Sequence, residues 1–150
     1  MKTTTQQPVA IACLFMWIGF VCAISFMEAW LKFRAPGVTL PIGLGIGRLV
    51  FAALNKVEWV FAIVVCASAV FFGKPVLNRQ NILLFGVIII LILQTTWLLP
   101  ALDARAMLHI ENKPVPHSNL HFLFVGGEVL KVAGLFVMAV SLFKQQKLTS

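Results

Sequence analysis

The sequence predicts an all-α fold: an integral membrane four-helix bundle that forms one transmembrane domain over residues 1–150. Hydrophobic residues make up 60% of the chain and charged residues only 11%, whereas about a quarter of the residues in a soluble domain are charged. Several apolar stretches approach the roughly 20 residues that a helix needs to cross a bilayer. Only short connections separate these stretches, so we expect no separate soluble domain.

The predicted spans are four, and each has its own boundary signals. In chain order they cover residues 9–28, 57–73, 82–100 and 120–143. Pro8 suits the first turn of a helix, where the backbone N–H has no helical partner in any case. In the third span, residues 94–96 add polarity, and Pro100 is expected to kink the helix because it removes a backbone donor. Pro114 and Pro116 favour an extended connection to the last span.

The connection after the first helix is rich in glycine and proline. Residues 35–47 read APGVTLPIGLGIG, and no charged residue lies between Arg34 and Arg48. Glycine and proline both disfavour a regular helix. Irregular backbone at membrane depth must be covered by protein or by water. We therefore expect a re-entrant or interfacial loop here, with the next helix starting at about Gly47.

Charged residues are distributed unequally between the two sides of the predicted bundle. One side carries only basic residues, namely Lys2, Lys74, Arg79, Lys144 and Lys147. The carboxylates and histidines lie toward the other side. Because cytoplasmic loops are enriched in Lys and Arg, we expect a multi-pass protein of the bacterial inner membrane with both termini in the cytoplasm. The net charge of +7 then indicates contact with the lipid bilayer and its anionic headgroups, and no nucleic-acid partner.

Ionisable residues of the last span fall on one predicted helical face. His117, His121, Glu128 and Lys131 follow each other at steps of four, seven and three residues, which places them on one side of a helix. Such groups usually face a bundle interior or a polar cavity, because exposure to lipid is costly. Glu128 and Lys131 could form a local ion pair that offsets their own burial. Alternatively, Glu128 accepts a proton or a cation and Lys131 sets its charge state.

The histidines support a hypothesis of metal binding. His109, His117 and His121 carry imidazole, the commonest transition-metal ligand, and the i, i+4 spacing of the last two places them on one helical face. In the competing interpretation His117, which follows Pro116, is an interface or capping residue. Both interpretations stay open, and the cofactor is unknown.

Other carboxylates and basic residues lie near the same predicted depth. The further candidates for a ligand or ion site are Glu28, Arg48, Glu58, Asp103 and Arg105. A di-iron bundle requires Glu-x-x-His motifs, and no histidine follows Glu28, Glu58 or Glu128 at that spacing. The sequence contains no Ser-His-Asp arrangement and no phosphate-binding loop. We therefore expect an ion-pair layer of arginines and carboxylates, and we assign no catalytic residue.

One segment resembles a known group of membrane domains. The run LLPALDARAMLHIEN (residues 98–112) is followed by a proline-containing connection and by HSNLH (residues 117–121). Over residues 80–143 this pattern resembles small bacterial four-helix membrane domains similar to transmembrane protein 205. The resemblance implies a four-span bundle and little about activity. Some related domains are linked to copper or other metal handling, which adds weight to the metal hypothesis.

The functional expectation is a small, non-catalytic membrane protein that acts as an accessory or binding subunit. It would assemble into a larger membrane complex or a homo-oligomer, or bind a lipid-like molecule. The first alternative is an ion- or metal-binding or transport protein that uses Glu128, His121 and His109. The second is a subunit of a membrane oxidoreductase that binds haem or quinone between the spans.

Overall fold

The computed structural model describes residues 8–71 and 79–148; for residues 79 and 145–148 it describes the backbone only. Within these ranges every regular element is helical. In chain order they are α1 (Pro8–Val21), the π-helix η1 (Cys22–Glu28), α2 (Ala29–Leu31), the 3-10 helix η2 (Lys32–Arg34), α3 (Leu40–Phe71), α4 (Arg79–Leu93), the π-helix η3 (Gln94–Leu98), α5 (Leu99–Ile110) and α6 (Leu120–Leu148). The predicted all-α class is confirmed for this part of the chain.

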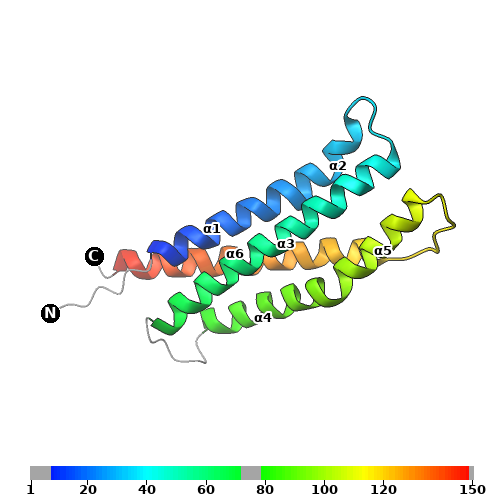
Figure 1. Cartoon of the computed structure of the whole chain (residues 1–150). Coiled ribbons are helices and arrows are strands. Elements are labelled where there is room, and N and C mark those ends of the chain that lie inside the picture. Colours follow the sequence, from blue (N-terminus) through cyan, green and yellow to red (C-terminus); the bar gives the residue numbers. More distant parts are fainter. Residues whose placement is uncertain (1–7, 72–78, 149–150) are drawn as a thin grey trace.

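Continuous runs of these elements form the bundle. The runs Pro8–Arg34, Leu40–Phe71, Gln80–Ile110 and Leu120–Lys144 are each long and apolar enough to cross a membrane. Neighbouring helices run in opposite directions; α6 packs against α1 and α4, and α3 packs against α1 and α5 (Figure 1). The predicted spans fall within these runs, apart from residues 72 and 73, which lie outside the described residues.

Apolar side chains predominate both in the interior and on the outside of the bundle. Leu14, Trp17, Leu91 and Leu135 have no exposed surface and belong to one core that all the long helices share. Exposed large apolar side chains include Leu49, Val60, Val70, Phe71, Phe122 and Leu130. Soluble monomers rarely expose so much apolar surface, so this exterior is typical of a protein that contacts lipid.

The glycine- and proline-rich segment is the main difference from prediction. The expected loop over residues 35–47 was wrong for residues 40–47, which form the first two turns of α3. Only residues 35–39 are irregular, with Gly37 at a φ of +80°, a conformation that glycine adopts without steric cost. Pro41 lies in the first turn, where its missing N–H removes no helical bond. Of the later glycines in α3, Gly43 and Gly47 lie where this helix packs closely on Phe33 and Lys32 of the preceding turn.

Gly43 forms the closest of these contacts. A Cβ atom at Gly43 would lie 2.1 Å from the Cε1 atom of Phe33, whereas a Cβ at Gly45 would have no atom within 4 Å. Overpacking costs about 1–3 kcal/mol, and Phe33 is partly exposed and can rotate. We therefore expect Gly43→Ala to lower the free energy of unfolding by about 1 kcal/mol.

Gly45→Ala is the matched control. It should raise the free energy of unfolding by up to about 1 kcal/mol, since alanine is the better helix former. Unfolding in mixed micelles that contain sodium dodecyl sulfate, followed by circular dichroism, measures both variants. Equal stability of the two variants would contradict the close contact at Gly43.

Two π-helical segments interrupt the first and third long helices. Pro100 lies in the first turn of α5, directly after η3. A proline removes one helical bond and its ring crowds the carbonyl four residues earlier, so helices commonly bend or widen at such a position. The chain changes direction between α4 and α5 (Figure 1). The kink expected at Pro100 is therefore present, whereas η1 has no proline and its sequence does not explain its wider turns.

Candidate functional site

Three charged side chains meet in the interior of the bundle. Glu128 and Lys131 come from α6 and have no exposed surface, and Glu58 comes from α3 and is 2% exposed. Lys131 Nζ lies 3.1 Å from Glu128 Oε1 and also donates to Glu58 Oε1. We call these three residues the buried charge cluster. The ion pair predicted within the last helix is present, but its ammonium group also bridges to α3.

Neutral donors complete the shell around the two carboxylates. Trp17 Nε1 of α1 donates to Glu58 Oε1 at 2.9 Å. Ser25 Oγ of η1 donates to Glu128 Oε2 at 3.2 Å, and Gln94 Nε2 of η3 donates to Glu128 Oε1 at 2.8 Å. Each of the long helices thus contributes a polar group. This pairing is essential, because moving an ion out of water costs several kcal/mol even in a relaxed protein.

Both π-helical segments supply a donor to Glu128. Ser25 lies within η1 and Gln94 is the first residue of η3, and both side chains are buried. A π-turn changes the register of the side chains, and such turns are frequent at functional sites. Gly127 provides the room: a Cβ atom there would lie 3.2 Å from Gln94 Nε2, whereas one at Gly126 would have no neighbour within 4 Å.

One atom of this shell lacks a partner. Gln94 is 1% exposed, and its Oε1 atom receives no hydrogen bond. Among the described residues, it is the only buried side-chain nitrogen or oxygen without one. An unpaired buried acceptor costs about 1–3 kcal/mol. The unpaired oxygen therefore marks a place where the cluster is short of hydrogen-bond donors.

A groove lies one helical turn from the cluster, toward the end of the bundle that holds residues 35–39 and 111–119. The outer groove, as we call it, is a partly open cavity of about 560 Å³ lined by α2, η2, α3, η3, α5 and α6. Its wall is mainly apolar; the rings of Phe51 and Phe124 meet edge to face there, with centroids 5.4 Å apart. Its volume falls within the roughly 300–1,000 Å³ of small-molecule sites.

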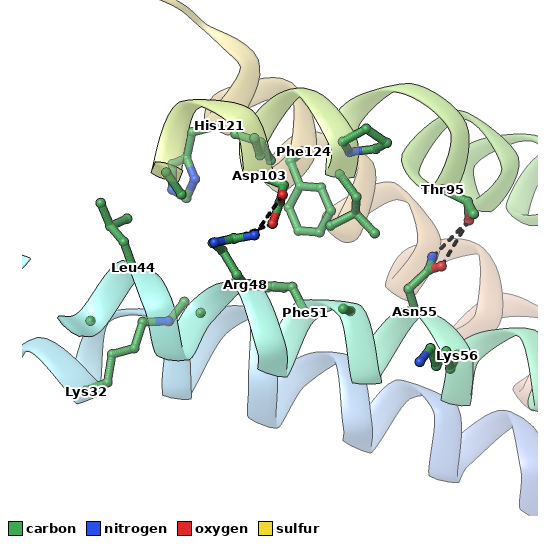
Figure 2. A pocket seen from close by; sticks show the side chains of 18 of the residues that line it. Lys32, Leu44, Arg48, Phe51, Asn55, Lys56, Thr95, Asp103, His121 and Phe124 are labelled. Carbon is green, nitrogen blue, oxygen red and sulfur yellow. Dashed lines mark hydrogen bonds and ion pairs between the residues drawn. The ribbon is translucent and has the colours of Figure 1, made fainter. Parts of the chain in front are cut away.

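Polar contacts join α3 to α5 and η3 along this groove (Figure 2). Arg48 pairs with Asp103 through two nitrogen atoms, one of them Nη2 at 3.0 Å from Oδ2. At the inner end, Asn55 Nδ2 donates to Thr95 Oγ1 at 2.9 Å. A two-point arginine–carboxylate contact fixes orientation as well as distance, so it holds α3 in register with α5.

The outer groove carries more positive than negative charge. Its basic side chains are Lys32, Arg48 and Lys56. Lys32 Nζ lies 3.2 Å from Glu28 Oε2, and Arg48 pairs with Asp103. Lys56 is exposed, and no acidic side chain in the described part of the chain pairs with it. One cation therefore stays available to a ligand.

The histidines do not gather into one site. His121 lines the outer groove, while His109 is exposed near the end of α5. The predicted helical face was wrong at His117, because α6 begins only at Leu120 and His117 lies in the preceding connection. Across residues 8–71 and 79–148, no three His, Cys, Asp or Glu side chains are placed to hold a metal ion. Metal binding therefore stays a prediction, and these residues do not form a set of ligands for it.

The predicted ion-pair layer is present only in part. Arg48 and Asp103 form the expected contact. Arg105 instead donates to the backbone carbonyl of Pro116, which ties α5 to the connection before α6. Arg34 lies over an aromatic ring, that of Trp30, at 4.7 Å from its centroid. The layer therefore mixes ion pairs with backbone and ring contacts.

Several members of the site were not assigned from the sequence. Trp17 and Ser25 lie in an apolar span, and Gln94 was noted only for its polarity. One signal was available for Trp17, since it lies in the middle of a span rather than at the interface where tryptophan is enriched. A buried indole N–H usually finds an acceptor, so its position indicated a buried polar partner.

Comparison with known proteins found no relative of this chain. No family model, no curated protein and no solved structure matches the chain. The resemblance to domains similar to transmembrane protein 205 therefore stays a prediction. The outer groove and the buried charge cluster are therefore the features that bear on function.

Proposed function

We propose that this chain is a multi-pass protein of the bacterial inner membrane and a non-catalytic binding subunit that holds an acidic, lipid-like molecule in the outer groove. The observation that carries the proposal is the combination of a mainly apolar cavity of about 560 Å³ with an unpaired lysine, Lys56. An amphiphile with one anionic head and an apolar chain matches both properties.

Membrane insertion is supported by the helices and by the surface. Four runs have the length and apolar character of spans, and large apolar side chains cover the outside. With an even number of spans both termini lie on one side. The basic residues near that side favour the cytoplasm. In this proposed topology the end of the bundle that holds the outer groove faces the opposite side.

The charges of the outer groove favour an acidic ligand. Lys32 and Arg48 each have a carboxylate partner, which leaves the Lys56 ammonium free. A carboxylate or phosphate head would complete this arrangement, whereas a cationic head would meet an excess of like charge. The apolar wall then accepts the chain of the same molecule.

Ligand binding is tested with stearic acid that carries a nitroxide on its chain, added to the purified protein in nanodiscs. Electron paramagnetic resonance reports the immobilised fraction. Ala52 lines the outer groove, whereas Ala53, which is also exposed, does not. We expect Ala52→Phe to fill the groove and weaken binding at least tenfold, and Ala53→Phe to bind like the unchanged protein. Equal binding by the two variants, or no immobilised probe at all, would refute the proposal.

The contribution of charge has its own comparison. Exposed ion pairs contribute up to about 1 kcal/mol, so Lys56→Gln should weaken binding of the acid by about two- to fivefold. Lys144→Gln removes an exposed lysine near the C-terminal end of α6, whereas the groove contacts the first turns of this helix. This substitution should leave affinity unchanged. The affinity for the methyl ester of the probe should be unchanged by both substitutions, because the ester has no charge. If Lys56→Gln does not weaken binding of the acid, the groove recognises only the apolar chain and the proposed role of Lys56 is wrong.

A further inference from the structure

The buried charge cluster does not balance its own charge. Glu58 and Glu128 would bring two negative charges and Lys131 one positive charge, all with at most 2% exposure. The other side chains that hydrogen-bond to the cluster, within the described residues, are Trp17, Ser25 and Gln94, all neutral. In the described part of the chain no second cation pairs with either carboxylate. An uncompensated buried charge is strongly unfavourable, so the cluster needs one more positive charge.

The hydrogen bonds indicate the same deficit independently. Gln94 Oε1 is buried and has no donor, although its own Nε2 lies 2.8 Å from Glu128 Oε1. An amide beside a carboxyl group can serve both protonation states. Its NH₂ donates to an ionised carboxylate, and its oxygen accepts from the O–H of an acid once the amide turns. A further hydrogen at this place would meet an acceptor that is now unused.

We propose that the buried charge cluster binds one proton, which the carboxyl groups of Glu58 and Glu128 hold as a pair. Both carboxylates have the Lys131 ammonium beside them, so the proton belongs to the pair. Glu58 accepts from Lys131 and from Trp17 at one oxygen. Glu128 lies 3.1 Å from Lys131 Nζ and accepts from Ser25 and from Gln94, whose own oxygen is the unused acceptor. Uptake adds H⁺ to a carboxylate and leaves the cluster neutral, with no other bond changed.

The buried charge cluster lies close to the outer groove. Three elements contribute a residue to the outer groove and a nearby residue to the cluster or its shell. In each pair the groove residue is given first: Asn55 and Glu58, Thr95 and Gln94, Phe124 and Glu128. The proton site therefore lies just behind the inner end of the groove. This inference concerns a different site from the amphiphile and does not depend on that proposal.

Infrared spectroscopy of the full chain in detergent at neutral pH tests the proton directly. A protonated carboxyl group has a C=O stretch that is separate from the carboxylate band and shifts in D₂O. We expect one such group per chain. Glu128→Gln and Glu58→Gln should each abolish the band, because either change leaves one carboxylate balanced by Lys131. Glu28→Gln, which removes a partly exposed carboxylate outside the cluster, should leave the band in place.

Several outcomes would overturn the proposal. Absence of the band of a protonated carboxyl group from the unchanged protein at neutral pH would overturn the proposal. Persistence of the band in Glu58→Gln would show that burial of Glu128 alone, rather than charge balance, retains the proton. A band that is present only after sodium is removed would identify the ligand as a sodium ion. Failure of one variant to fold leaves the other variant and the unchanged protein to decide.

Discussion

Replacing Lys131 by methionine is expected to lower the free energy of unfolding by about 3–5 kcal/mol, the cost of breaking a buried ion pair by removing one partner. Methionine has a similar length and fills the space, so the loss comes from charge and hydrogen bonds. Glu58 and Glu128 both lose the ammonium that joins them. Unfolding by sodium dodecyl sulfate in mixed micelles, followed by circular dichroism, measures the change.

Lys144→Met is the matched control for this substitution. Lys144 is exposed and lies in the same helix, α6. Surface substitutions usually change stability by no more than about 0.5 kcal/mol, and we expect such a small effect here. A loss for Lys131→Met that is no larger than that of Lys144→Met would contradict a structural role of the buried charge.

Trp17→Ala is expected to lower the free energy of unfolding by about 3–5 kcal/mol, the range for truncating a large buried aromatic side chain. Trp17 has no exposed surface, stacks with Phe61 at a centroid distance of 6.4 Å, and donates to Glu58. The variant therefore creates a cavity and removes a donor from a buried carboxylate. The same unfolding titration measures the effect.

Two further variants separate these causes. Trp17→Phe keeps most of the ring and removes the N–H, while Lys131 still donates to the same oxygen of Glu58. It should therefore cost about 1.5–3 kcal/mol, the range for one hydrogen bond to a charged group. Trp97→Ala truncates a tryptophan that is 54% exposed and should change stability by less than about 1 kcal/mol. If Trp17→Phe is as stable as the unchanged protein, the bond to Glu58 contributes nothing and the role of Trp17 is packing alone.

Much of the fold could be predicted because membrane helices are encoded locally. Length and apolar character identify a span without knowledge of its neighbours, and the four long helices contain the predicted spans as far as the structure describes them. The start of α3 was not predictable in this way. Gly43 is unfavourable in an isolated helix, and its tolerance depends on the contact with Phe33 across a turn. Local propensity carries no information about that contact.

The candidate site was predictable only where its members share one helix. The i, i+3 spacing of Glu128 and Lys131 indicated their pair, which the structure places at 3.1 Å. The link from Lys131 to Glu58 joins residues 73 positions apart, and no spacing rule covers it. Gln94 reaches Glu128 from the first residue of a π-helix. An α-helical wheel cannot predict the direction of this side chain, because it assumes the same number of residues per turn throughout the helix.

The most direct measurement of the central claim is a double-mutant cycle between Glu58 and Lys131. It compares Glu58→Gln, Lys131→Met and the double variant with the unchanged protein by unfolding in mixed micelles. Residues in one buried ion-pair network couple by about 0.5–3 kcal/mol, and we expect a value in the upper half of that range, with the double variant more stable than the sum of the single losses implies. Losses that add to within about 0.5 kcal/mol would show that α3 and α6 are not joined by this pair, and would contradict the buried charge cluster.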